Sequence, residues 1–149
     1  MTPVDAAQRF SGAEDPEIGA RVLAFVRAAR AHYPETEGDA PGFVAHLGRA
    51  CGGDVEQLRG LAGPDLWLAH ATASGCPGAL KRFESEVLAP RVAAMARRFD
   101  HALVEDVAQT LRLRLVAETE PLLLGYGGRG SLQGWISVTL ARALAKQQA

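Results

Sequence analysis

The segment that decides the fold is residues 77–116, PGALKRFESEVLAPRVAAMARRFDHALVEDVAQTLRLRLV. Its apolar residues recur at steps of three and four, which is the period of an amphipathic helix. The spacing predicts one helix over residues 77–99 and a second over residues 101–116, with Asp100 as the N-cap of the second. Pro90 lacks a backbone donor and its ring clashes with the preceding turn, so we expect a kink or a break there.

The same helical period continues on both sides of this segment. No stretch alternates with period two, β-branched residues are sparse, and no internal repeat is present. The fold class is therefore predicted to be all-α, with short connections that favour antiparallel neighbours. Residues 1–16 are polar and small, and we expect them to be frayed. The other expected helices cover residues 16–33, 42–50, 54–61, 66–73 and 131–146, with loops at 34–41 and 117–130.

Length and composition describe an ordinary globular protein. The chain has 149 residues, of which 48% are hydrophobic and 22% charged, and this composition excludes a mostly disordered or collagen-like chain. One domain of this length buries roughly 68–70% of its unfolded surface. The isolated Cys51 and Cys76 fit a reducing compartment. Because no signal-peptide pattern or membrane-spanning apolar run is found, we expect a cytoplasmic protein with no membrane partner.

The net charge of −1 hides an asymmetry between the two halves. Residues 1–80 carry 6 Arg, no Lys and 10 acidic residues, for a net charge of −4. Residues 81–149 carry 8 Arg, 2 Lys and 7 acidic residues, for a net charge of +3. This division suggests two working parts, although imbalances of this size also arise by chance.

The glycine-rich segment 125–130, GYGGRG, has the letters of a dinucleotide-binding turn and precedes a helix. Such a turn needs a ribose-binding acid about 20 residues further on, and no acidic residue follows Glu120. The four histidines are scattered, and none pairs with another His or a Cys at the spacing of a helical metal site. No nucleophile elbow is present. We therefore interpret the segment as a flexible glycine loop, and we expect no enzyme activity, no metal and no cofactor.

The basic residues of the second half are more informative. Arg142 and Lys146 are four residues apart and share one face of the last helix, while Tyr126 and Arg129 lie on the glycine loop before it. An aromatic residue and several cations in this order suit phosphate contact and base stacking on single-stranded nucleic acid. The alternative interpretation is a solvated cationic face that covers a buried stripe.

Three ordered blocks resemble the second conserved region of bacterial RNA polymerase sigma factors of the extracytoplasmic-function group. Residues 79–84, ALKRFE, resemble the opening A-x-x-x-F-E helix, and residues 104–112, VEDVAQTLR, resemble the A-E-D-L-V-Q-E-V-F-x-R helix. Residues 128–136, GRGSLQGWI, are similar to G-R-G-S-L-x-x-W-L in a myxobacterial-like branch. Residues 65–71, DLWLAHA, resemble the D-L-Y-L-A-C-A element that precedes the domain in that branch.

The resemblance implies a helical bundle like sigma region 2 with two binding faces. One face, with Asp106, Gln109 and Arg112, would bind the clamp helices of the β′ subunit of core RNA polymerase. The other would recognise or melt the promoter −10 element on the single-stranded non-template strand, and an anti-sigma factor is a further candidate partner. The candidate DNA-binding residues are Tyr126, Arg129, Trp135, Arg142 and Lys146, with core packing as the alternative role of Trp135.

The chain also departs from the family pattern. Thr110 stands where the family usually has Glu, Ser137 where this branch often has Arg, and Arg142 where many members have Asn. The family's second domain, which reads the −35 element, is not recognisable within the 149 residues. The alternative function is therefore a regulatory protein–protein interaction module that has a sigma-like fold and lacks promoter recognition.

We divide the chain into a flexible N-terminus (1–16), an acidic helical extension (17–76) and a sigma region 2-like domain (77–149). Charge complementarity suggests a further hypothesis, in which the acidic N-terminal part covers the basic face as a lid.

Overall fold

The computed structural model describes residues 1–148, and over this range the chain consists of helices and turns without a β-strand. Residue 149, with which the expected third segment ends, lies outside the described residues. The elements in chain order are α1 (Pro3–Ser11), α2 (Pro16–Ala31), α3 (Ala40–Cys51), η1 (Val55–Gly60), α4 (Gly63–Ala73), α5 (Pro77–Phe83), η2 (Glu84–Leu88), α6 (Ala89–Ala96), α7 (His101–Leu115), η3 (Leu122–Gly125) and α8 (Leu132–Gln148). The predicted all-α class is confirmed.

The predicted helix starts are confirmed by their capping hydrogen bonds. The Asp15 carboxylate accepts from the Glu17 N–H at 2.9 Å at the start of α2. The Asp100 carboxylate accepts from the Leu103 N–H at 3.1 Å at the start of α7. Such caps satisfy donors that the first turn of a helix leaves without a partner.

The expectation of a frayed N-terminus is wrong for residues Pro3–Ser11, which form α1. The missed signal is a capping box, in which Thr2 and Asp5 each accept from the other's backbone N–H. The buried Phe10 belongs to the main core. A Cβ added at Gly19 of α2 would lie 1.6 Å from the Pro3 carbonyl oxygen, so only glycine permits this approach of α1.

The helical run that contains Pro90 does not break at the proline. Instead, α5 and α6 are joined by η2, a single turn of π-helix in which the Ala89 N–H donates to the Glu84 carbonyl. Pro90 has no N–H to donate, and its ring needs room beside the carbonyl four residues earlier. The wider π turn provides this room while keeping the chain helical.

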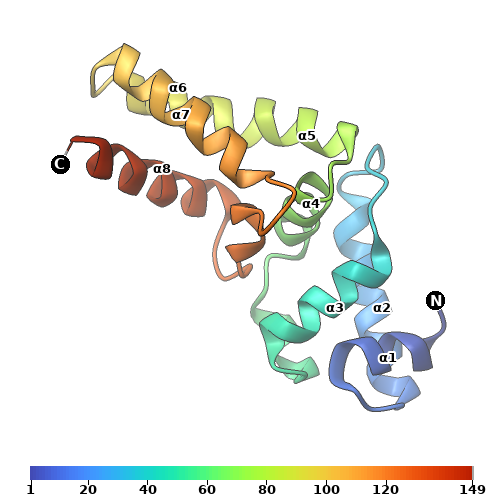
Figure 1. The fold of residues 1–149 in the computed structure, drawn as a ribbon. Helices are drawn as coiled ribbons and strands as arrows, with labels where there is room; N and C mark the ends of the chain where they lie inside the picture. The colour runs from blue at the N-terminus through green and yellow to red at the C-terminus, as the bar shows by residue number, and fades with distance from the viewer. Residues whose placement is uncertain (149) are drawn as a thin grey trace.

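The fold has a central helix, α4, between two groups of helices. In Figure 1, α1, α2 and α3 lie at one end of the molecule, and α5 to α8 lie at the other. Trp67 of α4 is fully buried, and its indole N–H donates to the buried Thr36 hydroxyl at 2.7 Å. One cluster of buried side chains runs from Phe10 to Leu144. The core is therefore continuous across the expected boundary at residues 76 and 77.

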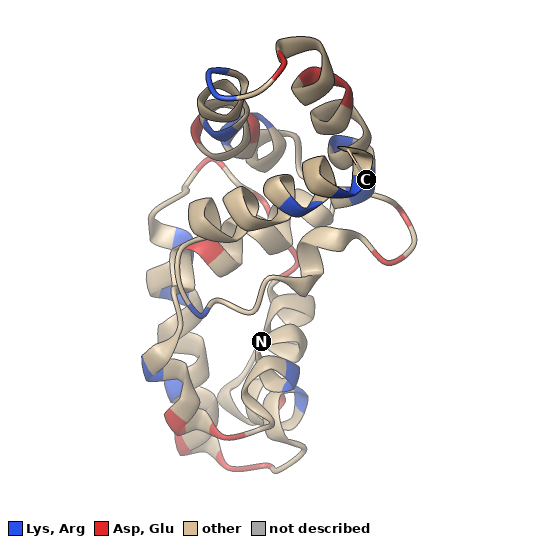
Figure 2. Ribbon diagram, turned by 90° about the vertical axis from the view of Figure 1, so that its left-hand side faces the viewer, with Lys and Arg blue, Asp and Glu red and all other residues tan. Residues whose placement is uncertain are grey.

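The acidic N-terminal part does not cover the basic helix α8. Figure 2 shows basic residues on the C-terminal half of α8, whereas α1, α2 and α3 lie toward the far end of the molecule. The helices with the most contacts to α8 are α7, η2, α6 and α4, and of these only α4 belongs to the expected extension. In this structure α1, α2 and α3 therefore do not lie over the cationic half of α8, and the contacts that the expected extension makes with the second half include those of α4 and of Gln57 of η1. Among residues 1–148, no helix is both long enough and apolar enough to cross a membrane.

Candidate nucleic-acid and protein interface

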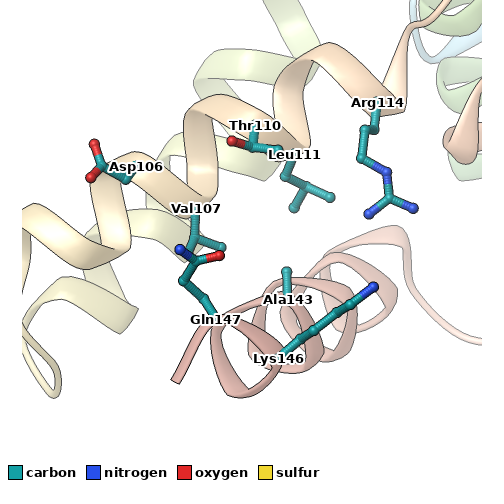
Figure 3. A pocket seen from close by; sticks show the side chains of 8 residues that line it. All are labelled: Asp106, Val107, Thr110, Leu111, Arg114, Ala143, Lys146 and Gln147. Atoms are coloured by element: carbon teal, nitrogen blue, oxygen red, sulfur yellow. The ribbon is translucent and has the colours of Figure 1, made fainter. Parts of the chain in front are cut away.

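Helices α7 and α8 pack against each other and leave a groove between their exposed sides. Figure 3 shows Val107 and Leu111 of α7 and Ala143 of α8 directed toward this space, whereas the Asp106 carboxylate points away from α8. The first part of the groove has a volume of about 350 Å³. It is lined by Asp106, Val107, Thr110, Leu111, Arg114, Ala143, Lys146 and Gln147.

A second hollow of about 290 Å³ continues the first toward the start of α8. Four residues line both hollows, so the two form one surface that we call the α7–α8 groove. The shared residues are Leu111, Arg114, Ala143 and Lys146. The second hollow adds Leu122, Trp135, Thr139 and Arg142.

The charge of the α7–α8 groove is mainly positive. Arg114, Arg142 and Lys146 line it, and Asp106 is its one acidic residue. None of these three cations has an ion-pair partner in the described part of the chain, whose salt bridges involve other residues. Unpaired cations above an apolar floor suit an anionic ligand that also has a flat or apolar part.

Arg142 and Lys146 lie together on the exposed side of α8, as their spacing predicts. The structure adds Arg114 of α7, which the sequence reasoning did not place at this site. The sequence does indicate on which side of α7 this residue lies. Arg114 follows Val107 by seven residues and Leu111 by three, and this spacing places all three on one side of the helix. Only the packing of α8 against this side of α7 brings the third cation to the first two.

The three predicted polymerase-binding residues do not share one face. Asp106 lines the α7–α8 groove, while Arg112 lies toward the η2 and α6 side of α7. The Arg112 guanidinium donates to both carboxylate oxygens of Glu84, with its shortest contact at 2.8 Å. Gln109 lies exposed, at the long distance of 3.5 Å from Arg112 Nη1. Asp106 and Gln109 therefore remain available for a partner, and Arg112 is already paired.

Tyr126 is buried, with 2% of its surface exposed. Its hydroxyl donates to the Gly130 carbonyl at 2.6 Å. Burial raises the pKa of its phenol, and the Asp65 carboxylate raises that pKa further. This burial contradicts the expectation of a ring that lies free on the loop to stack on a base. The sequence alone did not predict the hydrogen bond from the Tyr126 hydroxyl to the Gly130 carbonyl, which holds the loop against the tyrosine ring.

Arg129 is exposed and is not among the cations that line the groove. Its Nη2 donates to Gln57 Oε1 of η1 at 3.2 Å, so the side chain reaches toward the N-terminal group of helices. Arg129 therefore does not line the α7–α8 groove with Arg142 and Lys146.

Trp135 has a double role. It is partly exposed in the α7–α8 groove, while its ring packs beside Tyr126 with the two centroids 5.9 Å apart. The predicted core stripe of α8 is confirmed at Leu132, Ile136, Leu140 and Leu144, which are all buried. Trp135 is the one aromatic side chain among the residues that line the groove.

Two histidines that do not line this groove lie side by side, with His70 buried and His46 partly buried. The rings of His46 and His70 lie 6.1 Å apart. Desolvation lowers both pKa values, and the nearby Asp39 opposes this effect at His70. The described residues contain no group of three or more His, Cys, Asp or Glu side chains that could hold a metal ion.

These features describe an all-helical protein with a cationic groove between its last two long helices. No protein-family model matches the chain, and no curated protein or solved structure matches it either. Its function must therefore be argued from the sequence motifs and from the geometry of the groove.

Proposed function

We propose that the chain is a sigma-factor-like transcription initiation protein. In this proposal α7 binds the β′ clamp helices of core RNA polymerase, and α8 binds the −10 element as single-stranded DNA. The observation that carries the proposal is the α7–α8 groove, in which three unpaired cations lie beside the partly exposed Trp135. The order of the sigma-like sequence blocks supports the same assignment, because they form α5, α7 and the start of α8.

The DNA-binding part of the proposal follows from the charges of the groove. Arg114, Arg142 and Lys146 can neutralise phosphates, and the Trp135 ring can contact an unstacked base. Neutralising three phosphates on a single strand predicts a slope of about −2 in a plot of log affinity against log salt concentration. An isolated protein with a net charge of −1 binds DNA weakly, so we expect core polymerase to be needed for tight binding.

The polymerase-binding part rests on the outward side of α7. Gln109 is exposed there, Leu113 is 70% exposed one turn beyond it, and the exposed Asp106 lies where this side meets the edge of the α7–α8 groove. A polar rim around an exposed apolar side chain is the composition of a protein interface. A helix with this surface can pack along a coiled coil such as the clamp helices.

Co-purification with bacterial core RNA polymerase tests the polymerase part. We expect the wild-type chain to be retained and the double variant Asp106→Ala/Gln109→Ala to be retained much less. Glu14→Ala is the matched control, because Glu14 is an exposed acid outside α7. Absence of wild-type binding, or equal retention of the double variant and the control, would refute this part.

Fluorescence anisotropy with a labelled single-stranded oligonucleotide, in the presence of core polymerase, tests the DNA part. We expect Arg142→Ala/Lys146→Ala to weaken binding and to make the salt slope shallower by about 1.4. Arg9→Ala/Arg27→Ala is the control, since it removes two exposed cations from the N-terminal helices. If both double variants lost the same amount of DNA affinity, the net charge of the protein would determine binding, and the groove would have no specific role.

A second candidate function is a protein-interaction module that binds polymerase and does not read the promoter. The observation that favours it is the loop, where Tyr126 is buried and Arg129 is held by Gln57. This candidate predicts polymerase binding with equal affinity for −10 and scrambled oligonucleotides. Preference for the −10 sequence in the anisotropy experiment would reject it.

A further inference from the structure

The turn that leads into α8 is attached to the N-terminal part of the chain. The Ala62 N–H donates to the Gly128 carbonyl at 2.8 Å. The Leu132 N–H, at the first position of α8, donates to Asp65 Oδ2 at 2.9 Å. Both partners lie in or just before the first turn of α4, more than 60 residues earlier in the sequence.

The contact with Asp65 completes the capping of α8. Ser131 Oγ accepts from the Gly134 N–H at 3.0 Å, which satisfies a second donor of the first turn. The Leu132 N–H would otherwise be left without a partner in a partly buried place. A helix is normally capped by an acceptor from an adjacent residue of the chain, whereas α8 takes this acceptor from Asp65 of α4. The Asp65 carboxylate also places a negative charge at the positive end of the α8 dipole.

Packing fixes the loop at the same place. Gly128 has a φ of +79°, and a Cβ added to it would lie 2.4 Å from Leu66 Cδ1. Leu66 is itself buried, with 1% of its surface exposed. The loop therefore lies directly against α4 at the residue that follows Asp65, and a side chain at position 128 would not fit there.

We propose that Asp65 is a positioning residue for the ligand-binding side of α8. By holding the Leu132 N–H, Asp65 fixes the first turn of α8 and with it Trp135, which lies one turn further on at the end of the α7–α8 groove. Asp65, which belongs to the expected acidic extension (17–76), thus helps to position a residue of the candidate site. This inference rests on the proposed function for its DNA readout, and its structural readout is independent of that function.

Three variants of the full chain test the proposal. Asp65→Ala removes the acceptor, Asp65→Asn keeps an oxygen acceptor without the charge, and Asp15→Ala removes a cap of similar kind from α2. Hydrogen exchange is followed at the backbone amides of residues 126–135. DNA affinity is measured with core polymerase and the labelled single strand.

We expect Asp65→Ala to speed exchange of the Leu132 amide about fivefold, which corresponds to the loss of one helix cap. DNA binding by this variant should weaken by about twofold or more, because the competent position of α8 is less populated. Asp65→Asn should restore both values to near those of the wild type. Asp15→Ala should change exchange at the start of α2 and leave residues 126–135 unchanged.

Any one of three results would overturn the proposal. One is unchanged Leu132 exchange in Asp65→Ala, and another is an Asp65→Asn variant as defective as Asp65→Ala. Faster exchange with unaltered DNA affinity would also overturn it, since α8 would then bind without the cap. If the wild-type protein binds no DNA, the proposed function fails, and the exchange data still decide whether Asp65 fixes α8.

Discussion

Replacing Gly128 by alanine should destabilise the whole fold, and the structure allows the size of the effect to be estimated. The added methyl group meets Leu66 Cδ1 at 2.4 Å and Leu66 Cγ at 2.7 Å, and the backbone keeps a φ of +79°. Forcing an L-residue into this left-handed conformation costs about 1–2 kcal/mol. Inserting a methyl group into a packed site costs about 1–3 kcal/mol. We therefore expect the free energy of unfolding to fall by about 2–5 kcal/mol.

Thermal unfolding followed by circular dichroism at 222 nm measures this effect. A loss of this size lowers the Tm of a 149-residue chain by about 5–15 °C. Two controls separate the causes. Gly75→Ala has a φ of +83° and open space around the new methyl group, so it should show only the backbone cost of about 1–2 kcal/mol. Gly127→Ala, in the same loop, has neither strain nor contact and should be within about 0.5 kcal/mol of the wild type.

The ordering of these three variants is the decisive result. If Gly128→Ala were no less stable than Gly75→Ala, the contact with Leu66 would contribute nothing, and the loop would not be seated on α4 as described. If Gly128→Ala were as stable as Gly127→Ala, neither the backbone strain at position 128 nor the contact with Leu66 would affect stability.

The remaining predictions concern other parts of the molecule. A double-mutant cycle on Arg112→Ala and Glu84→Ala, measured by urea unfolding, should give a coupling energy of about 0.5–1 kcal/mol, because this ion pair is partly exposed. A coupling energy of zero would mean that Arg112 is not held by Glu84 and is free for a partner. Trp67→Phe removes the hydrogen bond to Thr36 and leaves a small cavity, so the free energy of unfolding should fall by about 1–3 kcal/mol. Burial lowers the pKa of His46 and of His70 below 6.5 in the folded state, so the unfolded chain takes up protons first and stability should fall as the pH drops below about 6.5. His46→Gln and His70→Gln should each flatten this dependence in urea titrations, and a wild-type stability that is constant from pH 7.5 to 5.5 would contradict it.

Local signals in the sequence predicted most of the helices correctly. The apolar period placed α2, α3, α4 and α7, and the residues Asp15 and Asp100 marked the starts of two of them. These predictions succeed because helix periodicity and capping depend on residues within about one turn of each other. Helix α1 has the same kind of signal, a capping box at Thr2 and Asp5, but its segment is too short and polar to show a clear apolar period.

The candidate site was predicted less well, because its geometry depends on which helices meet. Spacing along α8 was enough to pair Arg142 with Lys146. It could not show that Arg114 joins them from α7, that Arg129 turns toward Gln57, or that Tyr126 is buried. Each of these outcomes depends on contacts between residues far apart in the sequence.

For this protein, then, the order of residues along the chain decides the helical class, the helix starts and the cationic character of α8. These properties arise from neighbours within a turn or two, so a single sequence contains them. The continuous core across residues 76 and 77, the three-cation groove and the cap that Asp65 places on α8 are decided by tertiary packing. Packing brings together groups that are 67 residues apart in the Asp65–Leu132 contact and 72 apart in the Arg129–Gln57 contact. The energies that select those contacts come from burial and hydrogen bonding between segments, which no local sequence pattern records.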